Sequence, residues 1–157
     1  MTDLPMLEKR RIEAAILKHV YDTLKASHGD AVARQAVADA VRRSSIEQAQ
    51  GFAAEVGGKT SLQTFIDRQG LWRMGDALTT EVKEQTDTDY VFHVTRCRYA
   101  EMYRDMGLGE IGHLLSCQRD GTFCEGYDPK LKLTRTQTIM QGASHCDFHY
   151  RYEDEAG

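Results

Sequence analysis

The sequence predicts an α+β fold in which N-terminal helices pack on a four-stranded, mostly antiparallel sheet. Apolar residues recur at helical spacing up to residue 58, whereas β-branched and aromatic residues partly alternate in segments after residue 78. The expected order is three helices, two strands, two helices and two strands. Because no repeat or linker divides the chain, residues 1–157 are expected to form a single domain, with a helical part at 1–58 and an α+β part at 60–152.

Two long helices are expected at the N-terminus, over Leu4–Ser27 and Ala31–Val56. A short third helix is expected around Leu62–Ile66, because Thr60 and Gln63 have the spacing of a capping box. The stripe that we expect to be buried in the first helix consists of Ile12, Ile16, Val20 and Leu24.

The second half of the chain predicts two pairs of strands with two helices between them. Two antiparallel strands are expected between Leu78 and Cys97, with a turn at Thr86–Thr88. Asp120-Gly121 is a strong turn signal. The remaining expected elements are helices over Tyr99–Met106 and Gly109–Arg119 and strands over Lys130–Gln141 and His145–Tyr152.

Composition excludes several classes of partner. A net charge of −4 and a pI near 5.9 give no electrostatic reason to expect nucleic acid or an anionic membrane surface. No apolar run approaches the roughly 20 residues that span a bilayer, and acidic residues near the start argue against a signal peptide. We therefore expect a cytoplasmic protein, and its four cysteines are expected to be thiols that match no zinc-finger spacing.

One stretch, Glu110–Tyr127, carries several reactive side chains. At about 100° per residue, Glu110, His113, Cys117 and Asp120 fall on one stripe of a helix. Such a set can move protons, hold a metal or attack an electrophilic carbon. It is equally typical of the solvated side of an amphipathic helix.

The last two expected strands add further polar groups. In the penultimate strand Arg135 falls on an otherwise apolar face, where it must pair with Asp120 or Asp147 or bind a small carboxylate. Thr136 and Thr138 lie beside it as strand formers or as hydroxyl donors. In the last strand, alternation places one set of residues on the core face: Cys146, Phe148, Tyr150 and Tyr152.

The order and spacing of these segments resemble the family of L-2-amino-thiazoline-4-carboxylate hydrolases over residues 60–152. The resemblance rests on four motifs, namely Cys97-Arg98-Tyr99, the C-x-x-D of Cys117 and Asp120, Arg135-Thr136-x-Thr138, and Gly142-x3-Cys146-Asp147-Phe148. It implies a hydrolase that acts on a non-peptide carbon-nitrogen or carbon-sulfur bond of a cyclic amidine or isothiourea, such as 2-amino-thiazoline-4-carboxylate, and opens the ring to an N-carbamoyl amino acid.

Roles in such a reaction are assigned here by chemical type. Asp120 or Glu110 would hold the amidine, His113 would carry protons, and Arg135 would bind the substrate carboxylate. Cys117 or Cys146 would attack the amidine carbon, or water would attack it directly. The remaining substrate-binding candidates are Cys97, Thr136, Thr138 and Asp147.

A more distant resemblance to small-molecule-binding domains of the 4-vinyl-reductase type gives the alternative of a non-catalytic sensor. The zinc pattern of those domains, laid onto Cys146, would require Arg135 and Thr138 as ligands, and neither suits zinc. No cofactor is therefore expected. A zinc site from Cys97, Cys117, Cys146 and His113 is the alternative, and the N-terminal helices are expected to form a homo-oligomer.

Overall fold

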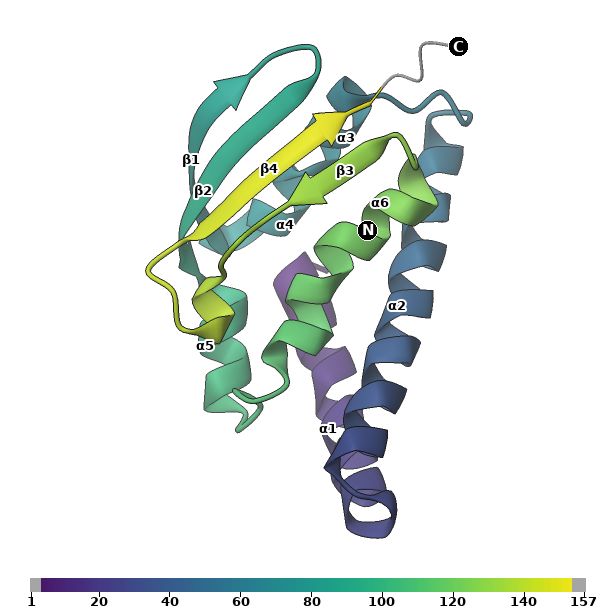
Figure 1. The fold of residues 1–157 in the computed structure, drawn as a ribbon, viewed down its shortest axis with the longest axis vertical. Coiled ribbons are helices and arrows are strands. Elements are labelled where there is room, and N and C mark those ends of the chain that lie inside the picture. The colour runs from purple at the N-terminus through teal and green to yellow at the C-terminus, as the bar shows by residue number, and fades with distance from the viewer. Residues whose placement is uncertain (1–3, 154–157) are drawn as a thin grey trace.

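The computed structural model describes residues 4–153 and has the predicted α+β architecture (Figure 1). The helices and helical turns are α1 (Met6–His28), α2 (Asp30–Glu55), α3 (Leu62–Arg68), α4 (Gly70–Arg73), η1 (Met74–Asp76), α5 (Arg98–Asp105), η2 (His113–Cys117), α6 (Gln118–Tyr127) and η3 (Ile139–Gln141). The strands are β1 (Leu78–Gln85), β2 (Asp89–Cys97), β3 (Leu131–Thr134) and β4 (Cys146–Tyr152). The predicted order of helices and strands is thus confirmed in outline.

The four strands form one antiparallel sheet in the order β1-β2-β4-β3. Phe92 of β2 lies opposite Phe148 of β4, and their rings stack with centroids 4.7 Å apart. Alternation in β4 is confirmed, since Cys146, Phe148 and Tyr150 are buried whereas the residues between them are only partly buried. One face of the sheet is therefore a core face.

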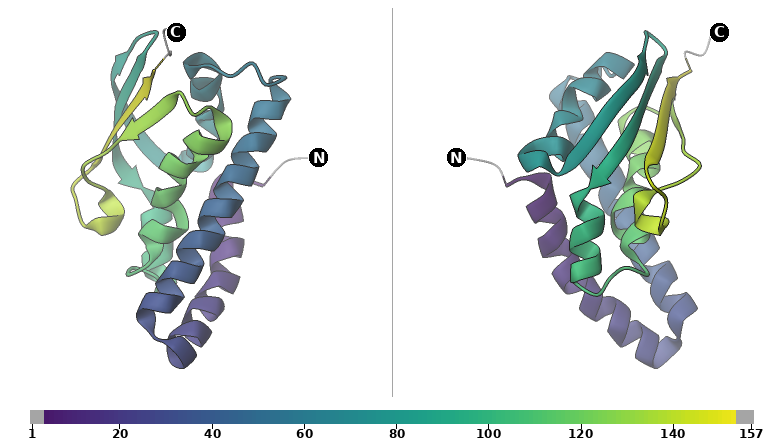
Figure 2. Two further views of the ribbon diagram at one scale, coloured as in Figure 1. Left: turned by 45° about the vertical axis from the view of Figure 1, so that its right-hand side comes forward. Right: turned by 90° about the vertical axis from the view of Figure 1, so that its left-hand side faces the viewer.

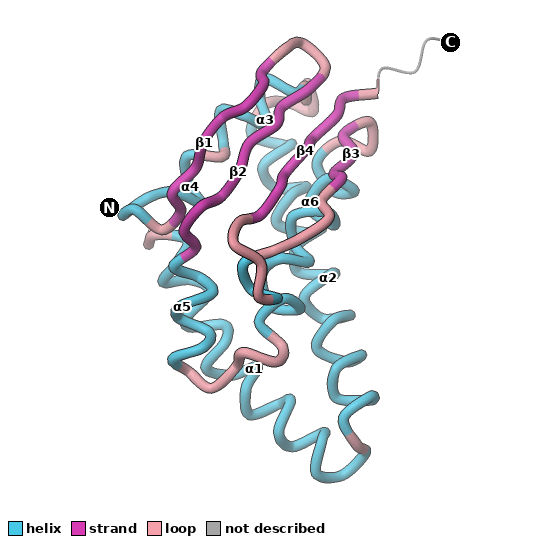
Figure 3. The backbone as a smooth tube through the Cα atoms, turned by 60° about the vertical axis from the view of Figure 1, so that its left-hand side comes forward, coloured by secondary structure: helices cyan, strands magenta, loops and turns pink. Residues whose placement is uncertain are grey.

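Helices cover this core face alone, and Figure 3 shows the four strands in front of them. Aromatic side chains of α3 and α6, including Phe65 and Phe123, pack against the sheet. The α1–α2 hairpin lies behind α6 and extends past the end of the sheet (Figures 1 and 2). There a second apolar cluster joins α1, α2 and α5. The space where the two clusters meet, between α6 and the sheet, holds the polar groups described below.

The buried side of α1 differs from the prediction. Ile12, Ile16 and Val20 are exposed, with Ile16 66% exposed. The side that faces α2 and α5 consists instead of Met6, Arg10, Ala14 and Tyr21. The helix has apolar residues on two faces, and the small Ala14 permits the closer approach of neighbouring helices.

The capping box of α3 lies one residue later than predicted. Ser61 Oγ accepts from Thr64 N at 3.1 Å, and Ser61 N donates to Thr64 Oγ1 at 2.9 Å. Thr60 instead donates to Asp128 at 2.9 Å. Ser61 is therefore the N-cap residue of α3, because the Thr60 hydroxyl is used in the hydrogen bond to Asp128.

The predicted turn at Asp120-Gly121 is wrong, since both residues lie inside α6. Helix η2, a turn of π-helix, runs straight into α6, and Gln118 N donates to His113 O, five residues earlier. Packing of α6 between α2 and the sheet outweighs the local turn preference of this dipeptide.

The predicted strand Lys130–Gln141 ends at Thr134. Beyond Arg135 the chain leaves the sheet, because the Asp147 carboxylate accepts hydrogen bonds from the backbone N–H groups of Thr136 (2.9 Å) and Gln137 (3.0 Å). These donors are therefore satisfied by a side chain instead of a neighbouring strand.

We expect Gly126→Ala to destabilise the fold by about 1–3 kcal/mol, because a Cβ there would lie 2.5 Å from the backbone oxygen of Ile46 in α2. Gly121→Ala, also in α6, is the matched control, since nothing lies within 4 Å of its added Cβ. It should be neutral or stabilise by up to about 1 kcal/mol. Urea unfolding measures both changes, and equal free energies of unfolding for the two variants would contradict the close α2–α6 approach.

Candidate functional site

A cavity lies between the core face of the sheet, α5 and the η2–α6 helix. We call it the thiol cavity, because its wall includes the thiols of Cys97, Cys117 and Cys146. The other polar residues that line it are Tyr99, Tyr103, Ser116, Asp120 and Arg135. Its apolar wall includes Trp72, Leu78, Val94, Met140 and Phe148. It encloses about 490 Å³ of atom-free space, part of which is open to solvent. The cavity thus combines an apolar lining with a few polar groups, as small-molecule sites do.

An ion pair joins α6 to the segment after β3 inside this cavity. Arg135 Nη1 donates to Asp120 Oδ2 at 2.7 Å, and Arg135 Nη2 donates to the Cys117 carbonyl at 3.1 Å. The guanidinium also lies 4.9 Å from the centroid of the Phe148 ring. Of the two predicted roles for Arg135, the structure therefore shows the pairing with Asp120.

The Asp120 carboxylate is a base in an apolar setting. Its side chain is 26% exposed, and its Oδ1 makes no hydrogen bond within residues 4–153. Burial raises the pKa of Asp120, and the positive charge of Arg135 opposes that rise. A carboxylate of raised pKa that keeps one free oxygen is suited to accept a proton.

The three thiols of the cavity are held in the neutral form. Burial raises the pKa of Cys97 to about 11, and burial together with the Asp120 charge raises the pKa of Cys117 further. Burial raises the pKa of Cys146 as well. Because the thiolate is the nucleophile, these cysteines are not activated for attack near neutral pH.

Tyr103 adds an unused polar group. Its hydroxyl is buried beside Ser116 without a hydrogen bond of normal geometry, and burial raises its pKa to about 12. A buried donor without a partner costs free energy, which a bound polar ligand would recover.

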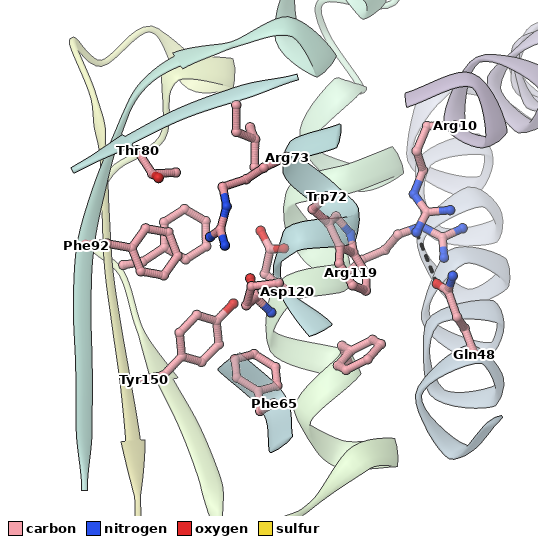
Figure 4. A pocket seen from close by; sticks show the side chains of 14 residues that line it. Arg10, Gln48, Phe65, Trp72, Arg73, Thr80, Phe92, Arg119, Asp120 and Tyr150 are labelled. Atoms are coloured by element: carbon pink, nitrogen blue, oxygen red, sulfur yellow. Dashed lines mark hydrogen bonds between the residues drawn. The ribbon is translucent and has the colours of Figure 1, made fainter. Parts of the chain in front are cut away.

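A second cavity adjoins the first and shares Trp72, Leu78, Asp120 and Phe148 with it. We call it the arginine cavity, because it is lined by Arg10, Arg73 and Arg119 (Figure 4). It encloses about 540 Å³ of atom-free space, part of which is open to solvent. Asp120 is thus a carboxylate common to both cavities.

Two predicted catalytic residues lie outside both cavities. Glu110 is exposed in the turn before η2, and His113 faces α2, where burial and the charge of Arg34 lower its pKa. The prediction assumed 100° per residue from Glu110 to Asp120. Helix η2 contains a turn with more residues than an α-helical turn, so the stripe does not continue through it.

Three predicted substrate-binding residues also lie outside the cavities. The Asp147 carboxylate is occupied by the backbone of Thr136 and Gln137 and by the Thr136 hydroxyl. Thr138 is buried and caps η3, where its hydroxyl accepts from Gln141 N at 3.2 Å. These side chains therefore shape the loop after β3 instead of lining a cavity.

Sequence reasoning missed the buried arginines Arg10 and Arg119. Arg10 stands in a basic run, Lys9-Arg10-Arg11, which predicts a solvated helix face. Arg10 lies four residues after Met6 and four before Ala14, and residues four apart share a helix face. This spacing could have indicated that Arg10 is on the buried side of α1. No local pattern marks Tyr103, Trp72 or Arg73, which reach the cavities only through packing of distant segments.

Within the described part of the chain, no group of three or more His, Cys, Asp or Glu side chains is arranged to hold a metal ion. The alternative zinc set of Cys97, Cys117, Cys146 and His113 is therefore not assembled here. None of the helices in residues 4–153 combines the length and apolar character needed to span a bilayer.

Solved structures share this fold at low sequence identity. The phenol-responsive sensory domain of the transcription activator PoxR, solved with phenol, aligns with a TM-score of 0.55 and 12% identity over 91% of this chain and 74% of that chain. A trafficking protein particle complex subunit 3 from Naegleria fowleri, covalently bound to palmitic acid, aligns with a TM-score of 0.50 and 8% identity over 93% of this chain and 96% of that one. These likenesses support a 4-vinyl-reductase-type fold.

Sequence comparison identifies the family. Among curated proteins none matches the chain significantly. A sequence profile of L-2-amino-thiazoline-4-carboxylic acid hydrolase matches residues 9–150, so it includes the N-terminal helices as well as the α+β part. The chain therefore belongs to the L-2-amino-thiazoline-4-carboxylic acid hydrolase family.

Proposed function

We propose that this protein hydrolyses a small cyclic amidine or isothiourea, such as 2-amino-thiazoline-4-carboxylate, in the thiol cavity. The observation that carries the proposal is Asp120, a carboxylate of raised pKa with one free oxygen that is fixed by Arg135 beside an apolar cavity. A cationic amidine is attracted to this carboxylate, and the surrounding apolar groups strengthen the attraction. The family membership supports the same reaction class.

In the proposed mechanism Asp120 serves first as base and then as acid. The oxygen of a water molecule bonds to the carbon between the ring nitrogen and the sulfur while Asp120 accepts one of its protons. The carbon-sulfur bond then breaks as the added hydroxyl oxygen becomes the carbonyl oxygen of the urea. Asp120 returns its proton to the departing sulfur, and the hydroxyl proton passes to solvent, which balances the positive charge that the amidine brought. The product is an N-carbamoyl amino acid with a free thiol, and Asp120 ends as it began. Arg135 keeps the carboxylate oriented throughout.

Direct attack by water is preferred over attack by a cysteine. Cys117 and Cys146 both line the cavity, yet burial keeps both thiols protonated. No histidine lines the cavity to remove their protons. We therefore assign these thiols to substrate binding, where they supply a polarisable wall for a sulfur-containing ring.

The second candidate function is a non-catalytic ligand-binding or sensor domain. It is favoured by the predominantly apolar walls of the thiol cavity and by the shared fold with the PoxR sensory domain, whose structure contains phenol. Binding of a cyclic amidine without release of thiol would support the sensor instead of the hydrolase.

We expect Asp120→Asn to reduce kcat at least about 100-fold, because a positioned general base contributes roughly 10²–10⁴-fold. Cys117→Ser should keep most of the activity, since water attack does not require the thiolate. Release of thiol from 2-amino-thiazoline-4-carboxylate measures turnover. Glu110→Gln is the control, because this predicted residue is exposed and lines neither cavity. Full activity of Asp120→Asn would remove the proposed base.

The pH profile tests the pairing of Asp120 with Arg135. Activity requires the Asp120 carboxylate, so it should fall as pH drops through the raised pKa of this group. Because the charge of Arg135 lowers that pKa, Arg135→Met should move the acid limb of kcat/KM to higher pH. Arg43→Met, on the exposed side of α2, should leave the limb in place. If the acid limb of kcat/KM moved to lower pH in Arg135→Met, the assignment of Asp120 as the base paired with Arg135 would be contradicted.

We further infer that the exposed apolar stripe of α1, Ile12, Ile16 and Val20, contacts a second copy of the chain. Its four-residue spacing gives one continuous ridge, which a copy related by a two-fold axis can match. Ile16→Glu should convert the oligomer to a monomer in light scattering coupled to size-exclusion chromatography. Val82→Glu, at an exposed apolar position of edge strand β1, is the control. A monomeric wild-type protein would exclude this contact.

A further inference from the structure

The arginine cavity carries more positive than negative charge. Arg10, Arg73 and Arg119 line it, and Asp120 is the acidic residue in its lining. Asp120 is already paired with Arg135, and Glu13 alone serves both Arg10 (3.0 Å) and Arg119 (3.4 Å). The four guanidiniums therefore face two carboxylates, which leaves an excess of positive charge beside a partly apolar space.

Arg10 and Arg119 are buried, and each has one N–H group without a hydrogen-bond partner in the described residues. Arg10 is 2% exposed and Arg119 is 5% exposed, values that arginine reaches only when its charge is compensated. Arg10 Nε and Arg119 Nη1 are buried and have no hydrogen-bond partner in the described residues. Their other donors reach Gln48 Oε1 at 3.1 Å and the Leu115 carbonyl at 3.1 Å. Burial and the neighbouring charge of Arg10 together lower the pKa of Arg119 to about 10.

Arg73 extends into the same cavity from α4 (Figure 4). It is half-buried, and within residues 4–153 its guanidinium makes no hydrogen bond or ion pair. A half-buried guanidinium has five N–H donors in a planar fork that matches a carboxylate. Arg73 is thus placed to close on an anion that enters the cavity.

Most of the rest of the wall is aromatic, and the non-aromatic residues in it are Gln48, Gln69, Leu78 and Thr80. The aromatic residues are Phe65, Trp72, Phe92, Phe123, Phe148 and Tyr150. Aromatic walls favour a flat, apolar body through offset or edge-to-face contacts, and the guanidiniums favour an anionic head group. The cavity therefore offers complementary surfaces to both parts of one molecule.

We propose that the arginine cavity is a binding site for a carboxylate carried on a flat aromatic body, with Arg73 binding the carboxylate and the buried Arg10 and Arg119 adding positive charge to the site. The proposal does not rest on the hydrolytic reaction assigned to the thiol cavity, so it stands whether or not that reaction occurs. Because both cavities share Asp120 and Trp72, occupancy of one alters the surroundings of the other.

Trp72 provides a direct readout, since it is the only tryptophan of the chain and lines this cavity. Benzoate is the probe, and benzamide is the neutral molecule of the same shape. Benzoate should change the Trp72 fluorescence and bind at least about tenfold more tightly than benzamide, because charge-assisted hydrogen bonds are the stronger ones. Equal affinities, or no saturable change with benzoate, would overturn the proposal. Tighter binding of inorganic phosphate than of benzoate would also overturn it.

Substitutions locate the carboxylate. Arg73→Met should weaken benzoate binding about tenfold to a hundredfold and leave benzamide binding unchanged. Arg43→Met, at an exposed position of α2 outside both cavities, should bind benzoate as the wild type does. Unchanged benzoate affinity in Arg73→Met would overturn the assignment.

Discussion

The ion pair between Asp120 and Arg135 is the constraint on which the site depends. It ties α6 to the point where the chain leaves β3, and it fixes the boundary between the thiol cavity and the arginine cavity. The pair is partly buried, so removing one partner would leave the other charge uncompensated in a partly apolar space. The pair therefore has two effects. It holds the segment after β3 against α6, and it keeps the Asp120 carboxylate in a largely apolar space.

The π-helical turn η2 makes this arrangement possible. It changes the helix face between His113 and Cys117, so that Cys117 and Asp120 reach the cavity while Glu110 and His113 remain outside. The loop after β3 depends in turn on Asp147, whose carboxylate binds two backbone N–H groups. Two local departures from regular structure thus bring Asp120 and Arg135 within 2.7 Å of each other.

Two kinds of chemistry lie side by side under one sheet. Three protonated thiols and an apolar wall surround one side of Asp120, whereas three arginines and aromatic rings surround the other. The first environment suits hydrolysis by water, and the second suits recognition of an anion. The fold, which is shared with the PoxR sensory domain, thus holds a carboxylate of raised pKa between two cavities.

Periodicity and the order of motifs were enough to predict the α+β class, the long N-terminal helices, the faces of β4 and the family. The sequence also indicated Cys97, Cys117, Asp120, Arg135 and Cys146, which share one cavity. Only the tertiary structure excluded Glu110 and His113, ended the strand at Thr134, and buried Arg10 and Arg119. Such outcomes depend on hydrogen bonds and packing between residues distant in the chain, such as the 15 positions from Asp120 to Arg135, and local spacing carries no information about them.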